Sequence, residues 1–161
     1  MVFQFGNSSG LCCKISFELI GNTNKSYNYT MTKATIVYLF KGNQVCLGMK
    51  KKGHGMGKWN GFGGKCELGE SFEDATVREV FEECGVKIEK NDLMQLGEIT
   101  YHEPAGDWDT RVYISTLWTN KPKESDEMKP KFFNIDDIPF ENMWENDKLW
   151  FPKIIFREKF I

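Results

Sequence analysis

Three glutamates, Glu79, Glu82 and Glu83, lie within five residues of one another in the stretch GKCELGESFEDATVREVFEECGV at residues 64–86. On a helix they share one turn, where like charges repel each other. Carboxylate oxygens, together with substrate phosphates, are the ligands that Mg²⁺ takes in proteins. The spacing therefore predicts half of a metal–phosphate site. A solvated acidic helix face is the alternative that spacing alone leaves open.

The same stretch carries the signals of a helix start and a helix end. Ser71 and Asp74 have the spacing of an N-cap and its acidic partner, and Gly85 is the residue type that follows a helix end. A helix of about three turns is predicted between them. Its expected buried face, opposite the glutamates, is made by Val77, Val80, Phe81 and Cys84.

Composition narrows the class of protein. The chain has 161 residues, of which 40% are hydrophobic and 27% charged, so one domain with a real core is expected. The net charge of −2 gives no general attraction to polymeric nucleic acid or to an anionic membrane. The chain has no apolar run of membrane-spanning length and does not start like a signal peptide, which predicts a cytoplasmic location. We expect a monomer.

Alternating and apolar runs predict the other elements. Strands are expected at 34–40, 44–49, 93–101, 111–119 and 131–135, with a polar connection at 102–109 and a helix at 147–157 capped by Asp147. Residues 1–32 are expected to be an extension with a β-hairpin at 14–30 that packs on the sheet of the domain at 33–161. The fold class predicted is α+β, an α/β/α sandwich with a mixed sheet between helices.

A glycine-rich connection, GHGMGKWNGFGGK at 53–65, precedes the acidic helix. Glycines allow a backbone to approach a ligand closely, so this loop suits a phosphate, with Lys50 as the best candidate for a phosphate contact. A flexible linker is the alternative.

Taken whole, residues 64–86 resemble the Nudix box, G-x5-E-x7-R-E-U-x-E-E-x-G-U, where U is a bulky aliphatic residue. The defined positions are filled by Gly64, Glu70, Arg78, Glu79, Val80, Glu82, Glu83, Gly85 and Val86. The resemblance implies a Nudix hydrolase whose loop–helix–loop binds Mg²⁺, with Mn²⁺ as a substitute, and a diphosphate. Glu79, Glu82 and Glu83 would carry the metal and general-base work. Arg78 and Glu70 would brace the loop and helix.

Outside the box, further segments are similar to the oxidised-purine nucleoside triphosphatase branch, the MutT-like 8-oxo-dGTP diphosphatases. These segments are GMKKKGHGMGKWNGFGGK, ESDEMKP, IPFENMWENDKLWFP and REKF, and the similarity runs without a gap from about residue 35 to 160. It implies Mg²⁺-dependent hydrolysis of oxidised purine nucleoside triphosphates to the monophosphate and pyrophosphate, which keeps damaged bases out of DNA.

Carried over by position, this resemblance implies a set of substrate contacts. Trp144 would stack on the base, while Asn60, Asp147 and Asn146 would read its edge. Thr35 and Tyr101 would line the same pocket. Gly63 and Glu127 would join the three glutamates of the helix at the metal.

Three positions depart from the branch. Asn146 stands where an acid usually precedes Asp147, and because an amide cannot exchange a proton, we expect a narrower base range that favours 8-oxo-dGTP over 2-hydroxy-dATP. His54 replaces a phenylalanine, and Trp108 replaces a smaller apolar residue.

The similarity stops before the C-terminal hairpin of this branch, and the pattern at 14–30 resembles that missing hairpin. We therefore expect a circular permutation in which residues 14–30 fill its place.

Other functions remain open at this stage. A Nudix hydrolase acting on an ordinary dNTP, a dinucleoside polyphosphate, ADP-ribose or a capped RNA is the nearest alternative. A non-catalytic Nudix module that binds a nucleotide or a partner protein is the alternative from another class, and a Ca²⁺-binding acidic helix is a third.

Overall fold

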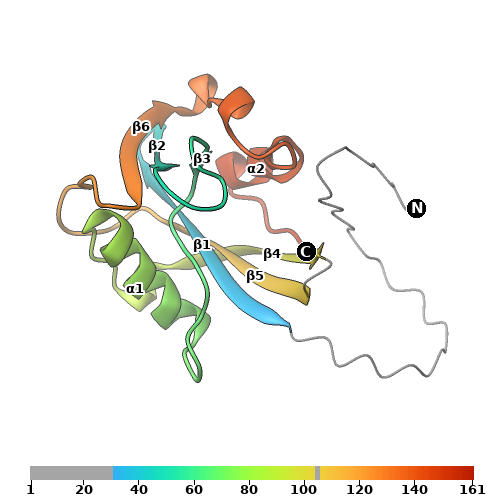
Figure 1. Ribbon diagram of the computed structural model, residues 1–161. Coiled ribbons are helices and arrows are strands. Elements are labelled where there is room, and N and C mark those ends of the chain that lie inside the picture. The colour runs from blue at the N-terminus through green and yellow to red at the C-terminus, as the bar shows by residue number, and fades with distance from the viewer. Residues whose placement is uncertain (1–30, 104–105) are drawn as a thin grey trace, which may run out of the picture.

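A mixed sheet of six strands runs through the computed structural model, which describes residues 31–103 and 106–161. The strands are β1 (Thr32–Lys41), β2 (Gln44–Lys50), β3 (Trp59–Asn60), β4 (Met94–Glu103), β5 (Gly106–Ser115) and β6 (Met128–Asn134). The order is β3–β2–β1–β5–β4, and β6 pairs with β2. β1 lies at the centre, parallel to β5 and antiparallel to β2, and the remaining pairs are antiparallel (Figure 1).

Two helices cover opposite faces of this sheet, α1 (Phe72–Cys84) and α2 (Asp147–Phe156) (Figure 1). Val37 and Leu39 of β1 pack on the α1 side, and Tyr38 and Phe40 pack on the α2 side, as the alternation of a strand requires. Three short 3₁₀ turns are present as well, η1 (Lys90–Asp92), η2 (Ile135–Asp137) and η3 (Phe140–Asn142). The predicted α+β sandwich with a mixed sheet is confirmed.

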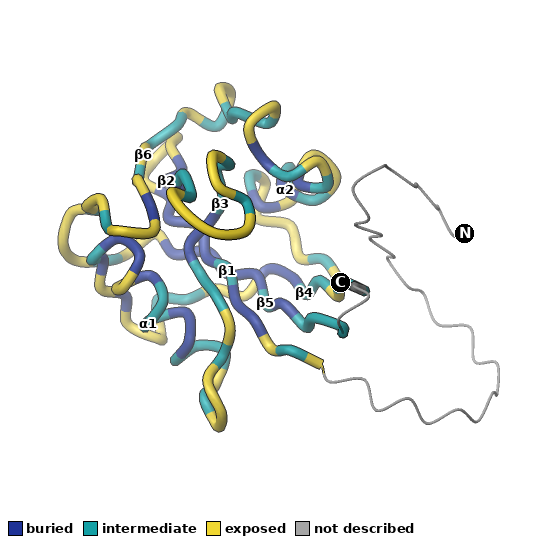
Figure 2. The backbone as a smooth tube through the Cα atoms, in the orientation of Figure 1, coloured by how far each residue is buried: buried dark blue, intermediate teal, exposed yellow. Residues whose placement is uncertain are grey.

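Burial follows the same layers. β1 is dark along most of its length in Figure 2, since both of its faces are covered. In the described residues no helix is long and apolar enough to cross a membrane.

The predicted boundaries of β5 were wrong. The strand occupies Gly106–Ser115 rather than 111–119, and Glu103 of β4 pairs directly with Gly106. Residues 102–103 and 106–109 therefore belong to two paired strands and not to a long polar connection. Residues 102–103 and 106–107 pair beyond the end of β1, which joins β5 only from Trp108 onward, so little apolar surface is buried there and the sequence does not look like a strand.

The N-terminal hairpin expected at 14–30 lies outside the described residues, so its packing stays a prediction. If it occupies the sheet edge at β4, deletion of residues 1–30 exposes that edge and leaves its apolar neighbours uncovered. Several large hydrophobic side chains are exposed near the end of the described chain or on β4: Met94, Leu149, Phe156 and Ile161.

We expect the deletion variant lacking residues 1–30 to be unfolded or to aggregate, as measured by circular dichroism and size-exclusion chromatography. A matched variant lacking only residues 1–10, which removes none of the predicted hairpin, should fold like the full chain. A folded and active protein lacking residues 1–30 would contradict the prediction.

Candidate active site

Both ends of α1 are fixed by the predicted caps. The Ser71 Oγ accepts a hydrogen bond from the Asp74 backbone N–H over 3.1 Å and donates to the Asp74 carboxylate over 2.6 Å. Gly85 has a positive φ of 71°, and its N–H donates to the carbonyl of Phe81 over 2.8 Å. The helix therefore starts and ends where the sequence predicts.

The buried face of α1 differs from the prediction. Phe81 is 49% exposed, whereas Glu83, expected on the solvent side, is only 3% exposed. The buried set is Ala75, Thr76, Val80, Glu83 and Cys84. The helix is rotated so that one glutamate faces inward against the loop before it, because Gly63 provides a hydrogen bond there.

Arg78 braces the helix against the loop that precedes it. Its Nε and Nη2 donate to the two carboxylate oxygens of Glu70 over 2.9 and 2.8 Å, a bidentate pair. Nη1 donates to Glu79 over 2.8 Å and to Glu82 over 3.3 Å, and Nη2 also donates to the carbonyl of Lys65 over 3.0 Å. One guanidinium thus holds a loop carbonyl and three carboxylates in place.

Glu83 is the most perturbed of the three glutamates. Burial raises its pKa from the usual 4.5 to about 8, although the Gly63 N–H donates to it over 2.9 Å and Lys50 contributes a positive charge. The charges of Glu79 and Glu127 raise the pKa of Glu83 further. A carboxylate in this position lacks sufficient positive charge around it.

The pKa of Glu79 is also set by opposing influences, and it is shifted less than that of Glu83. Burial raises its pKa, Arg78 lowers it, and the nearby charges of Glu82 and Glu127 raise it again. Gly64 lies against this side chain, since a Cβ at Gly64 would stand 2.6 Å from the Glu79 carboxylate. The loop backbone can approach the glutamate this closely only because the residue there is glycine.

The glutamates face a cavity of about 560 Å³ lined by Lys52, Glu79, Glu82, Glu83, Ser125, Asp126 and Glu127. Glu127 is held there because the Lys51 N–H donates to its carbonyl over 2.7 Å and Lys52 pairs with its carboxylate at 3.1 Å. Among the described residues no three acidic, His or Cys side chains lie close enough together, as they stand, to hold a metal ion. Their oxygen donors and excess negative charge nevertheless fit a hard divalent cation.

A second group of predicted residues gathers on the α2 side. The backbone N–H of Trp144 donates to the Asp147 carboxylate over 3.2 Å, and Asp147 is only 3% exposed. Burial raises the pKa of Asp147 from the usual 3.8 to about 7, against the lowering effects of that hydrogen bond and of Lys58. His54 stacks on Trp144 with ring centroids 4.8 Å apart, and the Lys58 Nζ lies 5.2 Å from the indole ring.

Asp147 does not cap α2 as predicted. Asn146 occupies the N-cap position without a side-chain capping bond, and Asp147 is the first residue of the helix. Its carboxylate turns back to the Trp144 N–H instead. The carboxylate is thereby tied to the backbone of Trp144.

The remaining predicted contacts divide between the two faces. Asn60 lies in β3, where its side-chain oxygen accepts from the Gly61 N–H over 2.9 Å. Tyr101 lies in β4 and affects the pKa of Tyr38 on the α2 side. The structure does not bring the Thr35 side chain to this pocket, because its hydroxyl bonds to Thr76 of α1 on the other face of the sheet.

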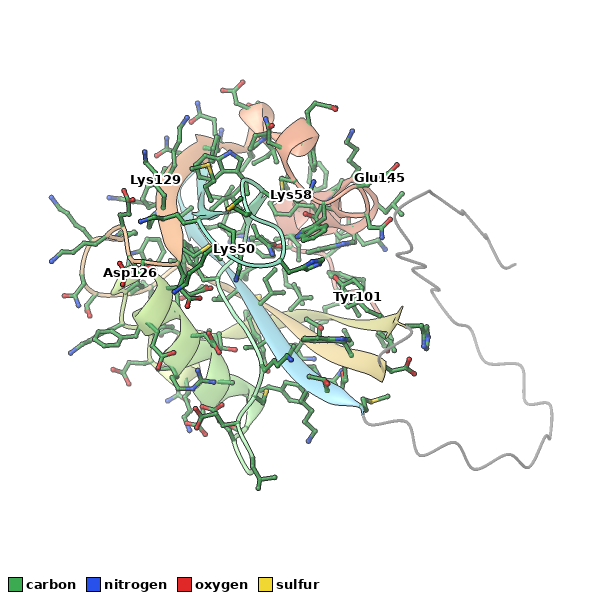
Figure 3. All side chains as sticks on the ribbon, in the orientation of Figure 1. Lys50, Lys58, Tyr101, Asp126, Lys129 and Glu145 are labelled. Carbon is green, nitrogen blue, oxygen red and sulfur yellow. The ribbon has the colours of Figure 1, made fainter. Side chains whose placement is uncertain are left out.

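Lys50 lies between the two groups, with Lys58 towards α2 and Asp126 over α1 in Figure 3. The glycine-rich connection is tied to β2 at this point, because the Lys50 N–H donates to the carbonyl of Lys58 over 2.9 Å and its carbonyl accepts from Gly57 over 2.8 Å. The connection also contains β3, so it is a folded loop rather than a flexible linker.

A model of the NUDIX domain matches residues 30–154. The chain belongs to the Nudix family.

Two curated relatives carry the same description, "Oxidized purine nucleoside triphosphate hydrolase". A protein of Danio rerio is 41% identical over 136 residues, which are 83% of this Nudix chain and 85% of the relative. A protein of Mus musculus is 38% identical over 128 residues, 78% of this chain and 81% of the relative. A crystal structure of a MutT protein from Bacillus halodurans superimposes with a TM-score of 0.69 at 23% identity, over 81% of this chain and 86% of that one, which supports the Nudix fold.

Sequence reasoning missed several residues of this Nudix site. Lys52, Ser125 and Asp126 line the acidic cavity, and Lys58 donates from its Nζ to the carbonyl of Met143 over 3.1 Å beside the indole of Trp144. The run of three lysines before the glycine-rich loop was the available signal for Lys52. Which lysine faces the cavity depends on the turn that follows β2, which the sequence does not specify.

The raised pKa of Asp147 predicts how stability depends on pH. Its folded-state pKa of about 7 lies above the unfolded value of 3.8, so the wild-type protein loses stability as pH rises from about 4 to about 7. Asp147→Asn removes the buried charge and keeps an oxygen for the Trp144 N–H. At about 1.4 kcal/mol per unit of pKa shift, the variant should gain up to about 4 kcal/mol near pH 8.

Urea unfolding between about pH 4 and pH 8 measures this difference. Asp136→Asn, at an exposed position, is the matched control and should leave the pH profile unchanged. If the free energy of unfolding depends on pH equally in the wild type and in Asp147→Asn, the Asp147 carboxyl is not held in its neutral form.

Proposed function

We propose that this protein hydrolyses oxidised purine nucleoside triphosphates, 8-oxo-dGTP above all, to the monophosphate and pyrophosphate, and so removes damaged nucleotides from the precursor pool. The observation that carries the proposal is the presence of two sites: an acidic cavity at α1, and a buried carboxyl, Asp147, bonded to the backbone of Trp144. The first suits a polyphosphate and its cation, and the second suits a purine and its edge. The description shared by the two curated relatives supports the same substrate class.

The cofactor in this proposal is Mg²⁺, with Mn²⁺ as a substitute. Glu79, Glu82, Glu83 and Glu127 are the residues that would hold it, and Gly63 lies beside them through its bond to Glu83. When bound, the cation supplies charge neutralisation for the triphosphate, the largest electrostatic requirement of phosphoryl chemistry.

The chain's own residues perform the remaining tasks. Arg78 keeps Glu79 and Glu70 in fixed positions, which supports a constant geometry at the glutamates. Lys50 and Lys52, near the acidic cavity, supply positive charge for phosphate oxygens. Glu82 or Glu83 takes the proton of the attacking water, and the sequence pattern favours neither. Attack at the β-phosphorus, with release of pyrophosphate, follows from the resemblance to the branch.

At the other end of the substrate, Trp144 offers its ring for stacking and Asp147 offers a carboxyl that can donate or accept near neutral pH. Asn60 lies on the neighbouring β3, and Asn146 precedes Asp147 with an amide that does not exchange its protons. His54 lies against the indole, so a purine that stacks on that face must displace the imidazole.

The proposal takes the enzyme to be a cytoplasmic monomer that acts on free nucleotides rather than on polymeric nucleic acid. Its nearest rival is a Nudix hydrolase of another nucleoside diphosphate-linked compound, such as ADP-ribose or a dinucleoside polyphosphate. Preference for the oxidised base during turnover separates the two.

Pyrophosphate release from 8-oxo-dGTP, dGTP, 2-hydroxy-dATP and ADP-ribose tests this directly. We expect 8-oxo-dGTP to exceed 2-hydroxy-dATP in kcat/KM by about tenfold or more, because the Asn146 amide cannot change its protonation to suit both bases. Asn146→Asp should narrow that ratio. Asn142→Asp adds the same charge in the exposed turn η3 and should leave it unchanged. Equal kcat/KM for the two oxidised substrates in the wild type would refute the role given to Asn146.

A further inference from the structure

The ESDE segment, residues 124–127, precedes β6 and contributes to the acidic cavity. The three glutamates of α1 line this cavity together with Ser125, Asp126 and Glu127 of the segment. Asp126 lies over α1 in Figure 3. The spacing between the carboxylates of α1 and those of the ESDE segment therefore depends on where the segment is held.

Lys51 ties the ESDE segment to the end of β2. Beyond the last pair of the β2–β6 ladder, the Lys51 N–H donates to the carbonyl of Glu127 over 2.7 Å. The Lys51 Nζ donates to the carbonyl of Ser125 over 2.7 Å and pairs with the Glu124 carboxylate at 2.8 Å. One residue thus holds both ends of the segment.

Ser125 gives the ESDE segment its internal shape. Its Oγ accepts hydrogen bonds from the backbone N–H groups of Glu127 and Met128 over 3.1 Å each, and its own N–H donates to the carbonyl of Met128 over 3.0 Å. These bonds join the segment to the first residue of β6. The bonds of the Lys51 ammonium hold its far end, at Glu124 and Ser125, against β2.

The three consecutive lysines after β2 begins to leave the sheet have different contacts. The positive charge of Lys50 acts on Glu83, and Lys52 pairs with the Glu127 carboxylate at 3.1 Å. Lys51 is not among the described residues that line the cavity. Its side chain therefore reaches the acidic site only through the ESDE segment.

We propose that Lys51 is a positioning residue of the metal–phosphate site, whose ammonium holds the ESDE segment against β2 and so fixes the Glu127 carboxylate beside the glutamates of α1. The inference deepens the proposed function and rests on it, since Glu127 is one of the residues that would hold Mg²⁺. Groups that orient the ligands of a metal ion commonly change its affinity by tenfold or more when they are removed.

Magnesium binding to the nucleotide-free protein tests this assignment. Lys51→Met removes the ammonium and keeps the backbone N–H that bonds to Glu127. Loss of a positive charge near a cation site should by itself strengthen cation binding, whereas loss of the tether should weaken it. We expect the Mg²⁺ concentration that gives half of the thermal stabilisation to rise about tenfold. Lys51→Arg keeps the charge and the donors and should restore most of the affinity.

The matched control is Lys52→Met, which removes the same charge from the next residue. Because Lys52 pairs with the Glu127 carboxylate itself, this variant frees a ligand and should bind Mg²⁺ more tightly than the wild type. In EDTA, Lys51→Met should melt close to the wild type, since a partly exposed ion pair contributes little stability. Its kcat for 8-oxo-dGTP should fall at low Mg²⁺ and recover at saturating Mg²⁺.

Unchanged or tighter Mg²⁺ binding in Lys51→Met would overturn the assignment. Equal weakening in Lys52→Met would also overturn it, because the effect would then belong to either lysine charge and not to the tether. A large loss of melting temperature in EDTA, with unchanged Mg²⁺ affinity, would make Lys51 a purely structural residue. Failure of the proposed function looks different, because the wild type would then prefer another nucleotide in turnover while Lys51→Met still weakened Mg²⁺ binding.

Discussion

Two glutamates on the inner side of α1 are held where water is scarce, and the rest of the acidic site is arranged around their charge. Glu83 is almost fully buried with a pKa of about 8, and Glu79 beside it also has a raised pKa. Arg78 lies close enough to balance Glu79 but bonds neither oxygen of Glu83. A folded protein tolerates such an imbalance when a cation bound in its working state removes it.

The sheet connects this acidic site to the base pocket. β2 ends at Lys50, whose charge reaches Glu83, and the loop that follows brings Lys52 to the acidic cavity and Lys58 to Trp144. In the proposed function a nucleotide spans these two places, with its phosphates at α1 and its base at the α2 side. The parts are held in register because that loop returns to β2 through paired backbone bonds at Lys50.

Much of the site could be predicted because its signals are local. The helix caps at Ser71 and Gly85 and the spacing of the glutamates depend on neighbours a few residues away, whereas the bracing role of Arg78 and Glu70 came from the resemblance to the Nudix box. The rotation of α1 could not be predicted, because Glu83 is turned inward by Gly63, which lies across a loop.

The sequence also could not show which residues of β1 face α1 and which face α2. Residues 34–40 are almost all apolar, so alternation could not show that Thr35 faces α1 while Tyr38 faces the α2 side. The predicted start of β5 was wrong for the opposite reason. Its first residues are polar and pair where little apolar surface is buried. In each case the deciding contact comes from another element.

The most direct test of the cation-binding account is the thermal stability of Glu83→Gln at about pH 8.5, with and without Mg²⁺. The folded pKa of Glu83 lies above its unfolded value, so the wild type carries the full cost of the buried charge at that pH. We predict that Glu83→Gln melts higher than the wild type in EDTA and loses most of the Mg²⁺-dependent stabilisation, whereas Glu141→Gln, at an exposed position, behaves like the wild type. An equal Mg²⁺ response in Glu83→Gln, or a lower melting temperature in EDTA, would contradict the account.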